Sequence, residues 1–292
     1  MKFAAIDIGT NAARLLIGEV EKEGGHSYVK KHSYTRIPLR LGEEVFGSGV
    51  ISKKKAQDFA NSIQAFRLIA DIFKVEKLRA CATSAMREAR NSDEIKDFIE
   101  NETGIEIEVI SGREEAKLIF STFFLLDIDK SVPFVVVDVG GGSTEVSVFE
   151  NGERVAAKSF RIGTLRLLKE KTDENIWSIM HDWIAEHVDL NSMHQIYATG
   201  GNINKAHKML GGLYMQPIQI NDLQALRDEL NEMSFADRMT RYQLKPDRAD
   251  VIVPALDIYL YLLNELSCQE IIVPKIGLSD GMIYNMYLDT TS

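Results

Sequence analysis

Two segments of this sequence resemble each other, and this internal repeat constrains the fold more than any other feature. Residues 3–20 read FAAIDIGTNAARLLIGEV and residues 134–150 read FVVVDVGGGSTEVSVFE, so that Asp7 aligns with Asp138. In each copy an apolar run ends in Asp-x-Gly, a short polar turn follows, and a second apolar run begins. Short turns between such runs are typical of β-hairpins. We therefore expect two related hairpins, one in each half of the chain.

The segments around the hairpins predict further strands and helices. Asn151-Gly152 is a strong two-residue hairpin signal. Extended chain is expected at 27–41, 78–82, 105–110, 145–149, 154–160, 196–198 and 270–273, and helices at Lys53–Phe73, 173–188, 221–233 and 247–266. Strands separated by helices indicate parallel βα units. Each half is thus an α/β domain, and we place the domains at 1–126 and 127–292, with both Asp-x-Gly turns facing an interdomain cleft.

The composition limits the classes of protein to consider. The 292 residues are 45% hydrophobic and 26% charged, with a net charge of −9. An acidic surface argues against a broad nucleic-acid interface. The first apolar run stops at Asp7, too early for a signal peptide, and no run reaches the length of a membrane span, so a cytoplasmic protein is expected. Cys81 and Cys268 are interpreted as buried thiols.

The second hairpin carries the strongest chemical signal. Gly140, Gly141 and Gly142 allow the backbone to approach a ligand closely, and the amide groups of such a turn can form an anion-binding concavity, with Ser143 and Thr144 beside it. Asp138 and Glu145 offer the hard carboxylate oxygens that Mg²⁺ prefers. The first hairpin offers Asp7, Gly9, Thr10 and Asn11 in the same arrangement, although these residue types also occur in ordinary turns.

Three further segments place polar residues after predicted strands. Ser111 and Glu114 fit a capping box, which leaves Glu115 in the first helical turn to act as a general base on water. Arg87 follows the strand at 78–82 and suits phosphate oxygens with its planar guanidinium group. Thr199, Gly200 and Gly201 join a strand to a helix N-terminus, a plausible second anion site or an ordinary turn capped by Asn202.

As a set, these motifs resemble the exopolyphosphatase and guanosine pentaphosphate phosphatase (Ppx/GppA) family. The resemblance covers nearly the whole chain and rests on IDIGTNAARLLI, ATSAMREARN, ISGREEAKLIF, VVDVGGGSTEVSVF, ATGGN and GLSDGMI. It implies two ribonuclease-H-like (actin-like ATPase) domains, a homodimer, and release of terminal orthophosphate from polyphosphate or of the 5′ γ-phosphate from pppGpp. By motif position Glu115 matches the family's catalytic base, and Asp138 and Glu145 match its metal-linked carboxylates. Its phosphate contacts match Asp7, Thr10, Asn11, Arg87, Gly140, Gly141, Gly142, Ser143 and Thr144.

The sequence departs from the family pattern in two places. Ala12 stands where the family often has a serine, so one hydroxyl contact to phosphate is missing. Long members carry additional C-terminal helical domains, whereas this sequence ends at Ser292, which predicts a weaker grip on long polyphosphate.

The residues and the resemblance together predict a Mg²⁺-dependent exopolyphosphatase in which Glu115 orients the attacking water. Three alternatives stay open. The first keeps the fold and takes pppGpp as the substrate. The second is an actin-fold, ATP-dependent kinase, ATPase or assembly protein, because such proteins share the two Asp-x-Gly hairpins. The third is a catalytically silent sensor of the same ligands.

Overall fold

In the computed structural model of the chain, the first apolar run becomes the middle strand of a five-stranded sheet. β1 (Phe3–Ile8) pairs antiparallel with β2 (Ala13–Glu23) and parallel with β4 (Lys77–Ala82). With β3 (His26–Ile37) and β5 (Glu108–Val109) the order is β3-β2-β1-β4-β5. All six residues of β1 are buried, as expected for a strand that is covered on both faces of its sheet.

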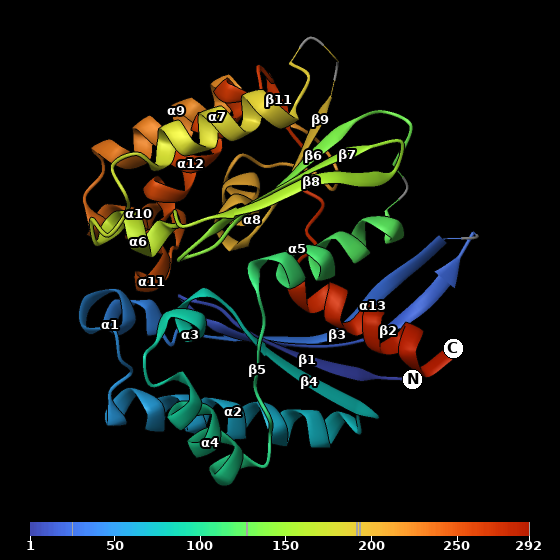
Figure 1. Cartoon of the computed structure of the whole chain (residues 1–292), viewed down its shortest axis with the longest axis vertical. Coiled ribbons are helices and arrows are strands. Elements are labelled where there is room, and N and C mark those ends of the chain that lie inside the picture. Colours follow the sequence, from blue (N-terminus) through green and yellow to red (C-terminus); the bar gives the residue numbers. More distant parts are fainter. Residues whose placement is uncertain (25, 127, 191, 193, 292) are drawn as a thin grey trace. The chain divides into compact units, whose positions relative to one another are not determined.

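Helices cover both faces of this first sheet. Figure 1 shows α2 (Lys53–Phe73) and α4 (Ser92–Thr103) on one face and α5 (Gly112–Ser121) and α13 (Leu278–Thr291) on the other. The short elements α1 (Leu41–Ser48), α3 (Ser84–Glu88) and the 3₁₀ turn η1 (Thr122–Leu125) complete this part. The helix predicted at Lys53–Phe73 is confirmed at both ends, and it buries Ala56, Phe59, Ile63 and Phe66 at helical spacing.

The second apolar run becomes the middle strand of a second sheet with the same topology. β6 (Phe134–Val139) pairs antiparallel with β7 (Thr144–Glu150) and parallel with β9 (Gln195–Thr199). β7 pairs with β8 (Glu153–Phe160) through the predicted Asn151-Gly152 turn, where both residues have positive φ. β11 (Glu270–Ile271) is followed by a parallel bridge from Ile272 to Tyr197, the position that β5 holds in the first sheet. The predicted ribonuclease-H-like, actin-like architecture is thus confirmed twice in one chain.

The helices of the second sheet share a single apolar core with it. They are α6 (Thr164–Leu168), α7 (Ile176–His187), α8 (Gly201–Met209), α9 (Ile220–Glu232), α10 (Phe235–Tyr242), α11 (Pro246–Ala249) and α12 (Ile252–Glu265), and β10 (Ile218–Gln219) pairs with β11. The single helix expected at 247–266 is wrong, because α11 ends before α12 begins. Pro254 has no N–H group and so fits only the first turn of a helix, which starts anew at Ile252.

The two sheets belong to separate compact units. The structure describes residues 1–24, 26–126, 128–190, 192 and 194–291. The first unit comprises Met1–Ile128 and Ile276–Ser292, and the second comprises Asp129–Lys275. This division differs from the expected domains 1–126 and 127–292, because the chain returns after β11 and α13 packs on β1, β2 and α5. Asp127, at the predicted boundary, lies outside the described residues.

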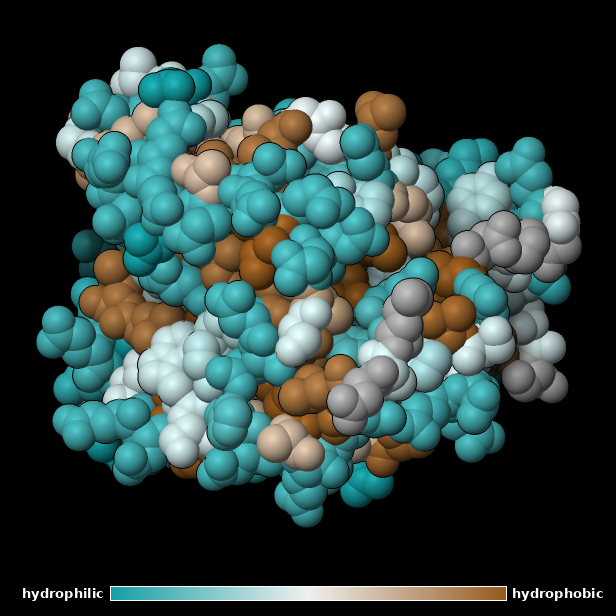
Figure 2. All heavy atoms as spheres, turned by 90° about the horizontal axis from the view of Figure 1, so that it is seen from above, coloured by the Kyte–Doolittle hydropathy of each residue, from teal (hydrophilic) through white to brown (hydrophobic). Residues whose placement is uncertain are grey.

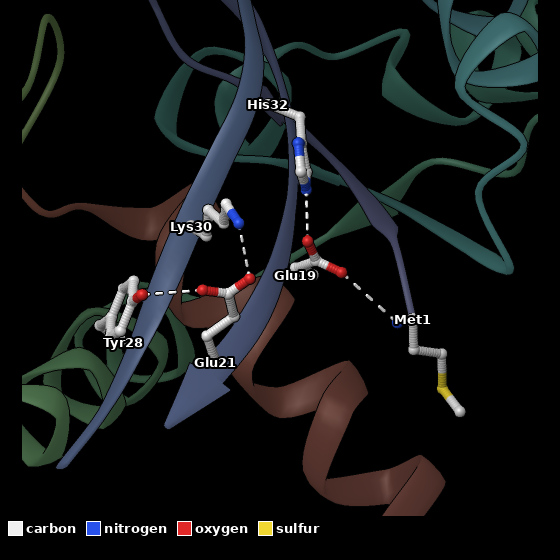
Figure 3. Close-up of polar contacts among 6 residues, drawn as sticks. All are labelled: Met1, Glu19, Glu21, Tyr28, Lys30 and His32. Atoms are coloured by element: carbon white, nitrogen blue, oxygen red, sulfur yellow. Dashed lines mark hydrogen bonds and ion pairs between the residues drawn. The ribbon is translucent and has the colours of Figure 1, made fainter. Parts of the chain in front are cut away.

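Polar cross-strand contacts hold the outer part of the β2–β3 hairpin (Figure 3). The Glu19 carboxylate contacts the His32 ring at 2.7 Å, and the Glu21 carboxylate accepts hydrogen bonds from Tyr28 and Lys30, each at 2.7 Å. The His32 contact lowers the pKa of Glu19, and Lys30 and then Tyr28 lower the pKa of Glu21. Such exposed pairs add little stability individually.

The surface is mainly polar on the face seen in Figure 2. Hydrophilic residues (teal) cover most of that face, and hydrophobic residues (brown) form separate patches among them. None of the helices in the described parts of the chain combines the length and the apolar character that a membrane span requires.

Candidate active site

The two Asp-x-Gly hairpins close with the same turn. The amide of Gly9 donates a hydrogen bond to the carbonyl of Ala12 at 3.0 Å, and that of Gly140 donates to the carbonyl of Ser143 at 2.9 Å. In each unit the turn lies where the central strand ends. Because the carboxyl ends of parallel strands meet at one edge of a sheet, each turn lies beside the loop that follows the next parallel strand, β4 or β9.

The partner across the hairpin differs between the two units. Asp7 lies opposite Arg14, and the two side chains form an ion pair with a distance of 2.6 Å between Nη1 and Oδ2. Asp138 lies opposite Glu145 in the equivalent register. Directly opposed residues of an antiparallel pair project from the same face, with Cβ atoms about 5 Å apart. The first unit therefore neutralises its aspartate with its own cation, whereas the second unit places two carboxylates side by side.

Hydroxyl groups orient both carboxylates of the second unit. The Thr199 hydroxyl donates to Oδ1 of Asp138 at 2.5 Å, and the Ser159 hydroxyl donates to Oε1 of Glu145 at 2.7 Å. Two adjacent, oriented carboxylates form a hard-oxygen donor set, and like charges placed directly opposite each other are destabilising unless a cation lies nearby. The residues present therefore fit a divalent cation.

Tyr259 supports this arrangement from the core of the second unit. Its hydroxyl donates to the carbonyl of Thr199 at 2.5 Å and accepts a hydrogen bond from the amide of Val139 at 3.3 Å. Burial, followed by the charge of Asp138, raises the pKa of Tyr259 well above its ordinary value, so the hydroxyl keeps its proton and remains a donor. Sequence reasoning missed Tyr259, which is far from the motifs along the chain and gave no local signal.

The two hydroxyl residues that follow the glycines of the second motif have different roles, one in holding the structure and one in binding a ligand. Thr144 is fully buried, and its hydroxyl donates to the carbonyl of Ile162 at 2.8 Å, a structural contact. The Ser143 hydroxyl makes no hydrogen bond within the described residues, which leaves it able to bind a ligand.

The segment between β9 and α8 has a structural role. Gly200 has φ of 120° and caps α8, so Asn202 is not the cap, and Gly201 is the first residue of the helix. Thr199, predicted to bind phosphate, here holds Asp138.

In the first unit the predicted base and the predicted phosphate-binding arginine are in contact. Nη1 of Arg87 lies 3.3 Å from Oε2 of Glu115 and donates to the carbonyl of Ile110 at 2.8 Å. Glu115 is in the first turn of α5, and its side chain is buried. Arg87, anchored on the end of β5, therefore fixes the position of the Glu115 carboxylate.

The neighbouring glutamate behaves differently. The Ser111 hydroxyl accepts a hydrogen bond from the Glu114 amide at 3.2 Å, so the predicted cap of α5 is confirmed. The reciprocal half of the capping box is wrong, because within the described residues the Glu114 side chain makes no bond back to Ser111 and instead lies 3.6 Å from Arg79. Glu114 and Glu115 thus point to different surroundings, as their separation of about 100° on the helix predicts.

The first turn is held by Arg40, which precedes α1, and by Gly42 in the first turn of that helix. The amide of Arg40 donates to the carbonyl of Asn11 at 2.9 Å, and that of Gly42 donates to the carbonyl of Thr10 at 3.0 Å. Thr10 and Asp7 are both buried. The structure therefore collects Asp7, Gly9, Thr10 and Asn11 in one turn of the first unit. Arg14 was missed as part of this group, although it occupies the position in the first hairpin that Glu145 occupies in the second.

Comparisons with known proteins agree with this arrangement. The sequence profile of the Ppx/GppA phosphatase family matches residues 20–290. Exopolyphosphatase 1 of Mycobacterium tuberculosis H37Rv is 26% identical over 97% of this chain and 87% of its own length. The phosphatase-containing bifunctional 3-dehydroquinate synthase/phosphatase of Fusobacterium nucleatum is 28% identical, over 93% of this chain and 44% of that protein.

A solved structure shows the same architecture over almost the full length. The crystal structure of an exopolyphosphatase from Cytophaga hutchinsonii superposes with a TM-score of 0.83 at 25% identity, and the match covers 99% of this chain and 98% of that one. The repeated strand order, the two matching turns and the extent of the profile match lead to one assignment: the chain belongs to the Ppx/GppA phosphatase family.

Proposed function

We propose that this protein is an exopolyphosphatase that releases terminal orthophosphate from inorganic polyphosphate by attack of water. The opposed carboxylates of Asp138 and Glu145 beside a three-glycine turn carry the proposal, because they unite a cation site and a phosphate cradle in one hairpin. The relatives named exopolyphosphatase support polyphosphate as the substrate.

Phosphatases of this family depend on a metal ion. Asp138 and Glu145 would hold it, and Thr199 and Ser159 would keep their carboxylates in place. Bound Mg²⁺ supplies positive charge that stabilises the phosphoryl oxygens during displacement.

The remaining groups are proposed to act on the phosphate and the water. The amides of the glycine turn and the hydroxyl of Ser143 bind phosphate oxygens in the second unit. Thr10 and Asn11 serve the same purpose in the first turn, where the ion pair with Arg14 keeps Asp7 in place. Glu115, held by Arg87, accepts a proton from the water that attacks the terminal phosphorus in line with the leaving oxygen.

Replacement of two adjacent glutamates tests the base. Glu115→Gln should reduce phosphate release from polyphosphate by at least about 100-fold, the usual contribution of a general base. Glu114→Gln is the matched control, because it removes the same charge one residue earlier, from a half-exposed side chain, and should keep near-normal activity. Equal activity of the two variants would show that Glu115 is not the general base.

The substrate is decided by comparing kcat/KM for polyphosphates of several lengths, pppGpp and ATP in the presence of Mg²⁺. A preference for pppGpp would select the guanosine pentaphosphate phosphatase alternative, and transfer of phosphate from ATP to another acceptor would select a kinase. Magnesium as the specific metal, the homodimer and the cytoplasmic location stay predictions. Metal titration, light scattering and cell fractionation test them in turn.

A further inference from the structure

The carbonyl groups of all three glycines in the second turn bind one short segment of the chain. The carbonyl of Gly140 accepts from the amide of Thr164 at 3.0 Å. That of Gly141 accepts from the amides of Leu165 and Arg166 at 2.8 and 3.1 Å. The carbonyl of Gly142 accepts from Nε of Arg166 at 2.8 Å. Gly163–Arg166, which we call the clamp, therefore fixes three successive peptide planes.

Fixing these carbonyls also fixes the direction of the amides. In a trans peptide the C=O and the next N–H point in opposite directions. The amides of Gly141, Gly142 and Ser143 consequently face away from the clamp, and none of them has an acceptor within the described residues. Successive amides that point to one side form a concavity for an anion.

The clamp lies too close to the turn for any side chain at Gly163. A Cβ atom there would be 2.6 Å from both the carbonyl carbon of Gly141 and the amide nitrogen of Gly142. Both are backbone atoms, which cannot rotate away as a side chain could. Alanine at this position must therefore displace the turn.

The side chain of Arg166 binds the carbonyl of Gly142, whereas the backbone amides of the clamp bind only the carbonyls of Gly140 and Gly141. Its side chain is buried, with a relative exposure of 5%, although arginine is rarely buried. In the first unit, the carbonyl of Asn11, equivalent to Gly142 in the repeat, is bound by the main-chain amide of Arg40. The second unit makes the corresponding contact with a side chain, so this contact can be changed by a single substitution.

We propose that Arg166 is a positioning residue that, with Gly163, holds the amides of Gly141, Gly142 and Ser143 in the orientation that binds phosphate. This inference rests on the proposed function for its substrate but concerns only the second unit. Arg166 acts through the turn, because its Nε atom binds the Gly142 carbonyl.

The test follows the glycine amides directly. In ¹⁵N-glycine-labelled enzyme with Mg²⁺, inorganic phosphate should shift the signals of Gly141 and Gly142, two of the 20 glycines. In Arg166→Met and in Gly163→Ala the phosphate concentration needed for this shift should rise at least tenfold. A displaced turn should also lower kcat/KM for polyphosphate by roughly 100-fold. Arg166→Lys, which keeps a cationic donor, should recover part of both effects.

Two variants serve as controls. Lys169→Met removes an exposed cation just after α6, and Gly47→Ala adds a Cβ atom where no atom lies within 4 Å. Both should respond to phosphate as the wild type does. A purely structural role for Arg166 predicts a lower Tm with an unchanged amide response, and that result would overturn the proposal.

The outcomes separate this inference from the proposed function. If the wild type cleaves polyphosphate but the two glycine amides do not respond to phosphate, the positioning role is wrong and the function stands. If the amides respond in the wild type and fail to respond in Arg166→Met and Gly163→Ala, while no enzyme form cleaves polyphosphate, the positioning role stands and the proposed substrate is wrong.

Discussion

Two carboxylates that face each other across a hairpin cost stability that an oppositely charged pair does not. Asp7 faces Arg14 at 2.6 Å, whereas Asp138 faces Glu145 in the same register of the second hairpin. The difference is a single residue type at one position of a repeat. It distinguishes a hairpin that is stabilised by its own ion pair from one suited to a bound cation.

Glu145→Gln tests the metal site. The amide keeps the acceptor for Ser159 but removes one negative charge. We expect a smaller rise in Tm than in the wild type when Mg²⁺ is added, because the variant offers the cation one negative charge fewer. Saturating metal at about 100 times Kd contributes about 2.7 kcal/mol to the wild type. Thermal denaturation with EDTA and with Mg²⁺ gives both values, and an unchanged response to Mg²⁺ would contradict the assignment of Glu145.

Another buried carboxylate, that of Asp280, lies at the start of α13. Asp280 pairs with Lys31 at 2.7 Å and accepts a hydrogen bond from the amide of Gly277 at 3.1 Å. Burial raises the pKa of Asp280, and the nearby Lys31 only partly opposes this effect. Because the folded-state pKa lies above the unfolded value, the folded protein binds the proton more tightly. Stability from this group is therefore present at low pH and is lost as the pH rises through the folded pKa.

Asp280→Asn removes this pH dependence. The Tm of the variant minus that of the wild type should therefore become more positive between pH 4 and pH 7. Asp289→Asn, at an exposed position of the same helix, is the matched control for the loss of one negative charge. A difference that falls with increasing pH would show that the ion pair with Lys31 outweighs burial.

At the scale of elements, α13 packs closely on α5. A Cβ atom on Gly281 would lie 1.9 Å from the carbonyl oxygen of Leu118, so the two helices approach at a position that only glycine allows. The SDG sequence of this segment thus has a packing function in the first unit, in addition to the charge of Asp280.

Gly281→Ala should therefore destabilise the protein by about 1–3 kcal/mol, the usual cost of overpacking. Gly277→Ala is the matched control four residues earlier, because no atom lies within 4 Å of its added Cβ. Chemical denaturation of both variants measures the difference. Equal midpoints would show that α13 shifts on α5 without cost.

At the scale of the whole molecule, the C-terminal segment from Ile276 belongs to the first unit, although the whole second unit separates it from the rest of that unit along the chain. Leu278, Met282, Ile283 and Met286 of α13 are buried, and the helix contacts β1, β2 and α5. The first unit is therefore complete only when the C-terminal end of the chain has been added.

Truncation after Lys275 tests this arrangement by hydrogen exchange. We expect faster exchange in β1, β2 and α5, because these elements lose the helix that covers them, and unchanged exchange in β6 and β9. Had the segment belonged to the second domain, as the sequence suggested, β6 and β9 would exchange faster instead.

Much of the fold could be predicted because it is encoded locally. The hairpins, the Asn151-Gly152 turn and α2 depend on neighbouring residues, on alternating or helical spacing, and on positive φ at a turn. The break before α12 was missed even though its cause, Pro254, is local, since the apolar spacing on both sides suggested one continuous helix.

The site was predictable in its residue types but only partly in its contacts. Asp138, Glu145 and Glu115 were identified because their chemistry is readable from motifs. Arg14 could also have been found, since antiparallel pairing across a turn of fixed length sets which residue faces Asp7. The contacts of Thr199 with Asp138 and of Arg87 with Glu115 join residues distant in sequence, so no local pattern predicts them.

The sequence by itself determined that this chain builds the same α/β unit twice, because a hairpin and its strand order follow from short-range patterns repeated in each half. Only the tertiary structure decided that α13 completes the first unit, that Tyr259 and Thr199 hold Asp138, and that Gly163 and Arg166 fix the glycine turn. The physical reason is that these contacts depend on which distant surfaces meet, and burial and close packing decide that once the whole chain has folded.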